Sequence, residues 1–123
     1  MVNVIEIAFT GYPVTDIPRA RAFYEGVLNL KLARDFAMPD AHWIEYDVGP
    51  STLAITNMSK DWKPSSSGPA IALEFENFDE AVSAVRNAGA KFLVEPTQSP
   101  SCRLAVVLDP DGNSLALHKR NSG

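Results

Sequence analysis

Two stretches of the sequence follow the same pattern, and this internal repeat constrains the fold more than any other feature. Residues 5–36 and residues 70–96 each begin with an apolar run, reach an aspartate, and place a glycine ten residues beyond it. The aspartates are Asp16 and Asp79, and the glycines are Gly26 and Gly89. Between aspartate and glycine, apolar residues recur at steps of three and four, which indicates one face of an amphipathic helix. The chain is therefore predicted to contain two copies of one supersecondary unit.

Around the two predicted helices, at residues 17–28 and 78–88, the pattern indicates eight strands. Alternation is clearest in the segment 42–48, where Ile44, Tyr46 and Val48 share one face. The expected strands are 4–12, 31–36, 42–48, 52–57, 69–75, 91–95, 103–108 and 114–119. The predicted fold class is α+β, with a first βαβββ module at about residues 4–57, a linker at about 58–68 and a second module at about 69–119. At 123 residues, we expect a single domain over residues 1–123.

Composition and charge exclude several classes of protein. The formal net charge is -4, the pI is near 5.0 and the longest basic run is Lys119-Arg120, so we expect no nucleic-acid partner. No window approaches the roughly 18 apolar residues of a membrane span, so we expect no membrane partner either. Cys102 is the only cysteine, which excludes an intramolecular disulfide and agrees with a cytoplasmic location.

Three short motifs, in a fixed order, carry a resemblance to a known family. They are Tyr-Pro-Val-Thr-Asp at 12–16, Arg-Ala-Phe-Tyr-Glu-Gly-Val-Leu at 21–28 and Asp-Pro-Asp-Gly-Asn at 109–113. Together they resemble the vicinal-oxygen-chelate superfamily, which includes glyoxalases, bleomycin resistance proteins and dioxygenases. The resemblance implies two βαβββ modules that form a curled mixed sheet around a concave pocket. It also implies a small-molecule ligand and a homodimer.

The usual metal-binding positions of that superfamily carry no ligand side chains here. A histidine normally stands seven residues before each turn aspartate, and a glutamate stands three residues after the Asp-Pro-Asp-Gly-Asn turn. These positions hold Phe9, Ala72 and Ala116, and the remaining position should fall in strand 52–57, which has no histidine or carboxylate. Phenyl and methyl groups have no lone pair for a divalent metal. We therefore expect no cofactor, with a divalent metal at unusual positions as the alternative.

Three ionisable side chains are candidates for catalysis. If Ala72 and Ala116 face the pocket, two-residue alternation places Glu74 and His118 there as well. Glu45 lies on the more polar face of strand 42–48. Glu45, Glu74 and His118 are interpreted as acid and base groups or as an unusual metal site, or else as solvated or hydrogen-bonded strand residues.

Further positions are candidates for ligand binding. They are Phe9, Trp43, Ala72, Cys102, Arg103 and Ala116. Cys102, beside Arg103 at the start of the seventh strand, is either a reactive thiol or a small buried hydrophobe. An aromatic wall for a flat ligand is predicted, unless its rings belong to the core. The residues of this wall are Phe9, Phe36, Trp43 and Trp62, with Trp62 in the linker over the pocket mouth.

Two functions from different classes stay open. The first is a metal-free module that binds a small aromatic or cationic molecule, as the bleomycin-resistance branch does; the acidic charge and the aromatic pocket positions favour it. The second is a lyase or isomerase of the glyoxalase type that uses Glu45, Glu74 and His118, with or without a divalent metal. The sequence contains no phosphate-binding glycine loop, serine nucleophile elbow or His-Glu-x-x-His motif.

Overall fold

A computed structural model describes residues 2–121 of the chain. The first half contains β1 (Thr10–Pro13), α1 (Ile17–Arg21), a π-helical segment η1 (Ala22–Val27), β2 (Leu32–Met38), β3 (Ala41–Val48) and β4 (Ser51–Thr56). The second half contains β5 (Ile71–Glu74), α2 (Phe78–Asn87), β6 (Phe92–Gln98), β7 (Cys102–Leu108) and β8 (Ser114–Arg120). The predicted order βαβββ, linker, βαβββ is confirmed. Among the described residues, no helix has the length and apolarity needed to span a membrane.

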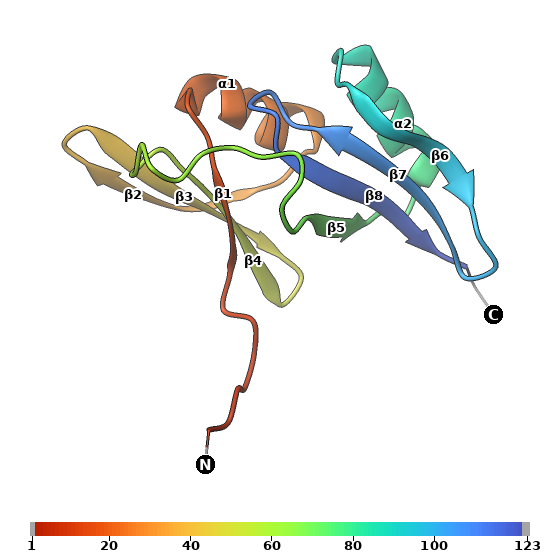
Figure 1. Cartoon of the computed structure of the whole chain (residues 1–123), viewed down its shortest axis with the longest axis horizontal. Coiled ribbons are helices and arrows are strands. Elements are labelled where there is room, and N and C mark those ends of the chain that lie inside the picture. Colours follow the sequence, from red (N-terminus) through yellow and green to blue (C-terminus); the bar gives the residue numbers. More distant parts are fainter. Residues whose placement is uncertain (1, 122–123) are drawn as a thin grey trace.

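Each half forms its own four-stranded mixed sheet. The strand order is β1-β4-β3-β2 in the first sheet and β5-β8-β7-β6 in the second, and the pairs β1–β4 and β5–β8 are parallel. This confirms the α+β class and the glyoxalase-like modules. The structure differs from the expectation in one respect, because no strand pairing within residues 2–121 joins the two sheets. They lie side by side and uncurled, with both helices on the same side of them (Figure 1).

The first strand is shorter than the sequence predicts, and the expectation of a strand at 4–12 is wrong for residues 4–9. β1 begins at Thr10, which pairs with Leu53. Because β4 itself begins at Ser51, the chain before β1 soon passes the end of its partner strand. Residues 2–9 extend away from the sheet instead (Figure 1), and their apolar side chains are exposed, Ile5 to 82%.

Both modules begin their helix with a side-chain cap, although the repeated aspartate provides this cap only in the first module. The Asp16 carboxylate accepts the backbone N–H of Arg19 at 3.0 Å. In the second module Asn77 accepts the N–H of Glu80 at 3.0 Å, and Asp79 lies inside the first turn of α2. Asn77 is therefore the structural counterpart of Asp16, because an N-cap needs extended backbone before the first turn.

The second helix ends at Gly89 as predicted, whereas the repeated glycine does not mark the end of the first helix. The left-handed residue after the helix is Gly89 in the second module, with φ 83°, and Asn29 in the first, with φ 59°. The first helical segment is thus one residue longer than the second, measured from the N-cap to the left-handed residue that follows the helix. Its π turn accommodates this residue, since the N–H of Leu28 donates to the carbonyl of Phe23, five residues earlier, at 3.0 Å. Gly26 lies within this turn and is not the counterpart of Gly89.

The core lies between the helices and one face of each sheet. Ile44 and Tyr46 of β3, Leu115 and Leu117 of β8, and Val85 of α2 are all fully buried. The intervening strand residues point to the other side. We call these two uncovered sides the open faces, and they are the surfaces on which the predicted site residues should stand.

The Asp-Pro-Asp-Gly-Asn turn joins the two modules. The buried Asp109 carboxylate accepts the hydroxyl of Tyr24 at 2.7 Å, and the amide of Asn113 donates to the carbonyl of Pro13 at 2.7 Å. Burial, together with the neighbouring Asp109, holds the pKa of Tyr24 well above its ordinary value, so the hydroxyl stays protonated and donates. Gly112 adopts φ 93° within the turn. This motif is therefore a structural connection between the modules.

Candidate functional site

The open face of the first sheet carries aromatic and acidic side chains. Trp43 and Glu45 stand on it because their neighbours Ile44 and Tyr46 point toward the helices. The Phe9 and Trp43 rings meet edge to face, with centroids 5.1 Å apart and an interplanar angle of 89°. Residues that lie far apart in the sequence thus form one aromatic surface.

Glu45 is held in place by two donors. The Nε1–H of Trp43 donates to its Oε2 at 2.8 Å, and the Nε of Arg34 donates to its Oε1 at 2.5 Å. The bond from Arg34, and then that from Trp43, lowers the pKa of Glu45. Both oxygens of the ionised carboxylate already accept a hydrogen bond. Glu45 is therefore better suited to orienting the Trp43 indole than to accepting a proton.

On the second sheet, the parallel register places the predicted site residues in two adjacent pairs. Ala72 pairs with Ala116, and Glu74 pairs with His118. The Nδ1 of His118 lies 2.6 Å from the Oε1 of Glu74. The structure therefore brings these two candidates into direct contact.

A second donor anchors Glu74. The backbone N–H of Arg120 donates to its Oε2 at 2.7 Å. This bond, followed by that from His118, lowers the pKa of Glu74. Glu45 belongs to the other sheet, and within residues 2–121 no three histidine, cysteine or acidic side chains gather where they could hold a metal. The three predicted catalytic residues thus divide into one pair and one separate carboxylate.

The structure corrects the expected position of Arg103. Its guanidinium lies 4.5 Å from the centroid of the Phe78 ring and donates to the carboxylate of Asp79 at 2.7 Å, so it faces α2. Cys102 is partly buried, and its Sγ lies 3.5 Å from the Oγ of Ser99. Consecutive strand residues point to opposite faces, so Arg103 and Cys102 do not line one pocket.

The linker supplies Trp62, which the sequence analysis placed in the aromatic wall and over the pocket mouth. The indole of Trp62 lies on β1, since a Cβ atom at Gly11 would be 2.9 Å from its Cη2. The same Cβ would be 3.6 Å from the Cε2 of Phe9, so both rings flank Gly11. A glycine inside a strand is the signal that could have indicated this approach, because it marks places where another group comes close to the backbone.

A hollow of about 530 Å³ lies beside Trp62, between β1 and β5. Gly11 and Ala72 line it, so one expected pocket position shares a cavity with the linker indole. The volume is within the range of small-molecule sites. We call this cavity the seam hollow.

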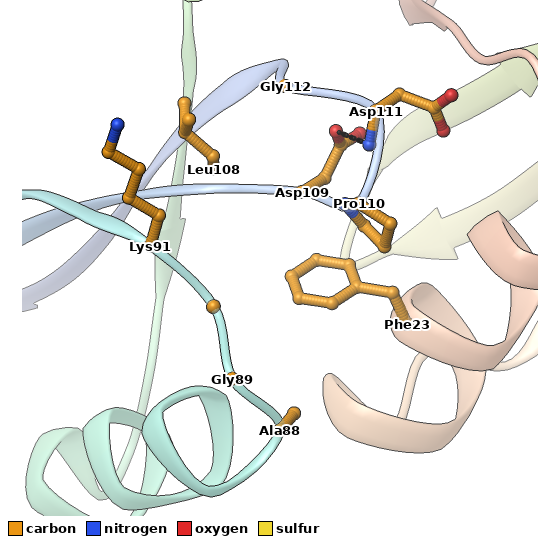
Figure 2. Close-up of a pocket in the computed structure, with 10 residues that line it drawn as sticks. Phe23, Ala88, Gly89, Lys91, Leu108, Asp109, Pro110, Asp111 and Gly112 are labelled. Carbon is orange, nitrogen blue, oxygen red and sulfur yellow. Dashed lines mark hydrogen bonds between the residues drawn. The ribbon is translucent and has the colours of Figure 1, made fainter.

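Another hollow, of about 480 Å³, opens on the helix side of the molecule (Figure 2). Phe23 of η1 faces Lys91 and Leu108 across it, and the side chain of Asp111 points away from it. None of the predicted site residues lines this cavity. It is therefore separate from the two open faces.

The residues present do not fit the metal that the superfamily usually holds. Phe9, Ala72 and Ala116 offer no donor atom, and β4 (Ser51–Thr56) contains no histidine, cysteine or carboxylate. Near Ala72 and Ala116, the described residues bring together two ligand-type groups in the contact between Glu74 and His118.

Comparison with known proteins shows the family. The sequence profile of the Glyoxalase/Bleomycin resistance protein/Dioxygenase superfamily matches residues 6–117. A lactoylglutathione lyase of Salmonella typhimurium is 34% identical over 114 residues, which cover 85% of this chain and 84% of that protein. The chain belongs to the glyoxalase/bleomycin resistance protein/dioxygenase superfamily.

Solved structures show the same fold at lower identity. TnmS3, an antibiotic binding protein from Streptomyces sp. CB03234, matches with a TM-score of 0.81 and 20% identity, over 98% of this chain and all of its own. Glyoxalase I of Leishmania major matches with a TM-score of 0.77 and 23% identity, over 94% of this chain and 87% of its own. A binding protein and an enzyme therefore share this architecture, and the side chains must decide between them.

Proposed function

We propose that the protein binds a small, flat aromatic molecule without a resident metal. The observation that carries this proposal is the aromatic surface formed by Phe9 and Trp43, which continues past Gly11 to Trp62 at the rim of the seam hollow. Aromatic rings beside a cavity of about 530 Å³ offer a large stacking area to a planar ligand. The lack of donor atoms at Phe9 and at the two alanine positions favours binding over metal-assisted chemistry.

The likeness to TnmS3 supports the proposal at the level of the fold. That protein is an antibiotic binding protein, and its modules superpose on almost the whole of this chain. The same scaffold is therefore used by a protein that binds an antibiotic. The choice of ligand here depends on Trp43, Trp62 and their neighbours.

A second candidate function is a lyase or isomerase of the glyoxalase type. Two observations favour it: the His118 ring lies 2.6 Å from Glu74, and a relative at 34% identity is a lactoylglutathione lyase. In that case the pair would move a proton on a bound substrate. Glu74→Gln would then abolish turnover, whereas the binding proposal expects aromatic ligands to bind this variant unchanged.

We further propose a cytoplasmic homodimer. The apolar side chains of residues 2–9 are exposed, and β2 and β6 are uncovered outer strands of their sheets. A second copy would cover such surfaces, which otherwise risk uncontrolled association.

The binding proposal is tested with a neutral aromatic probe. Naphthalene-2-carboxamide and its saturated ring counterpart are titrated into the protein, and the indole N–H signals of the two tryptophans are followed by NMR. We expect only the aromatic amide to bind, and Trp43→Ala to weaken it by about tenfold. Leu93→Ala, which shortens an exposed apolar residue of β6, is the matched control and should change nothing. Equal binding of both amides, or an unaffected Trp43→Ala variant, would contradict the proposal.

A further inference from the structure

The position of Trp62 is fixed from both ends of the linker. The N–H of Met58 donates to a threonine hydroxyl at the end of β4 at 3.1 Å, and the N–H of Ser65 donates to the Oδ1 of Asn113 at 3.1 Å. Between these anchors the indole rests on Gly11, yet 40% of Trp62 stays exposed. A large ring that is held in place and still open to solvent offers a ready stacking surface.

Two cavities meet at this ring. The seam hollow lies on the side of β5, and a second hollow of about 580 Å³ lies toward the end of β4. Trp62 and Lys63 line both of them, and Lys60 lines the second. A cationic side chain is therefore next to the stacking surface on either side.

The lining of the seam hollow is positively charged, unlike the protein as a whole. The formal net charge of the chain is -4, but the described residues that line the seam hollow include Lys63 and no carboxylate. Within residues 2–121, neither Lys60 nor Lys63 takes part in an ion pair, whereas Arg34 and Arg86 each contact a carboxylate at 2.7 Å or closer. The second hollow is more nearly neutral, because Asp40 lines it with Lys60 and Lys63 and Asp61 precedes Trp62 in the sequence.

We propose that this linker site selects a flat aromatic carboxylate. The ring of the ligand stacks on the exposed face of Trp62, and its carboxylate pairs with the ammonium group of Lys63 in the seam hollow. The inference rests on the proposed binding function and narrows it, because it replaces the expected aromatic or cationic ligand with an aromatic anion. A half-enclosed hollow screens such a pair less than open water does.

The test compares two probes that differ only in charge. Naphthalene-2-carboxylate and naphthalene-2-carboxamide are titrated at neutral pH, and the Trp62 indole signal, assigned with Trp62→Phe, reports occupancy. We expect the carboxylate to bind at least about fivefold more tightly than the amide. Lys63→Gln should remove this preference and leave the affinity for the amide unchanged. Lys91→Gln, a lysine on the helix side, is the charge-matched control and should keep the preference.

The possible results separate this inference from the function on which it rests. Equal affinity for both probes overturns the anion site and leaves the aromatic binding function standing. A preference for the carboxylate that survives Lys63→Gln also overturns it, since another residue would then bind the charged group of the ligand. If neither probe binds at about 1 mM, the anion site is rejected and the aromatic binding function loses its support as well.

Discussion

Tyr24 is the residue whose removal should cost the fold most. It is fully buried, its ring lies 6.2 Å from that of Tyr46, and its hydroxyl donates to the Asp109 carboxylate across the two modules. We expect Tyr24→Ala to lower the free energy of unfolding by about 3–5 kcal/mol. Tyr24→Phe keeps the ring, and the Asn113 amide still donates to the same Asp109 oxygen at 3.0 Å, so this substitution should cost only about 0.5–1.5 kcal/mol. Denaturant unfolding measures both; an unchanged midpoint for Tyr24→Ala would refute this packing.

Glu74 should titrate below its ordinary value of 4.5, because the N–H of Arg120 and the ring of His118 both stabilise its charged form. Because its pKa is lower in the folded than in the unfolded protein, this carboxylate stabilises the fold at pH values above its unfolded pKa. That contribution is lost as the pH falls through the folded pKa. Carbon-detected NMR titration of the side-chain carboxyl measures the midpoint. His118→Gln should raise it only partway, since the backbone donor remains; a wild-type midpoint at or above 4.5 would show that these bonds do not form.

At the scale of elements, the contact between β1 and the linker makes Gly11 a sensitive position. An added Cβ would lie 2.9 Å from the Trp62 ring, so Gly11→Ala must displace the indole. We expect little change in the free energy of unfolding, a shifted Trp62 indole signal and weaker binding of naphthalene-2-carboxylate. Gly26→Ala is the control, because its Cβ meets nothing within 4 Å. An unmoved Trp62 signal in Gly11→Ala would mean that the linker does not rest on β1.

The elements themselves were largely predictable, because each follows from local patterning. Alternation in β3 and three- and four-residue steps in α2 are properties of neighbouring residues. The length of β1 was not predictable in this way, since a strand ends where its partner ends and β4 begins only at Ser51. The cap of α2 could not be assigned from the sequence for a related reason: Asn77 and Asp79 are both good capping residues, and only the backbone conformation distinguishes them. Arg103 was misplaced because the side of the sheet on which it lies can be deduced only from knowing which residues of β7 are buried.

The arrangement of the whole molecule depends on contacts that join distant parts of the sequence. The repeat correctly predicted two modules, and the register of β5 with β8 brought Glu74 to His118 as alternation suggested. Periodicity could not predict the contact between Trp62 and Gly11, because the linker has none, and its sequence signal was a glycine inside a strand. The sequence could therefore indicate Trp62 as part of an aromatic wall, but not that its indole rests on Gly11.

The exposed apolar surface of residues 2–9 and the uncovered outer strands predict a homodimer in solution. Sedimentation at micromolar concentration should give about twice the chain mass of 13.4 kDa. Replacing Ile5 and Ile7 together with serine should weaken the association, because the substitutions lie outside both sheets and remove only exposed apolar area. A wild-type protein that sediments as a 13.4 kDa monomer would contradict the dimer.

The central claim is that an aromatic surface, and not a metal, holds the ligand. The most direct measurement combines elemental analysis of protein purified without a metal-affinity column with titration of naphthalene-2-carboxylate before and after treatment with a chelator. The account predicts less than about a tenth of an equivalent of divalent metal and the same affinity in both titrations. A stoichiometric divalent metal whose removal abolishes binding would contradict the account and favour metal-assisted chemistry at the pair formed by Glu74 and His118.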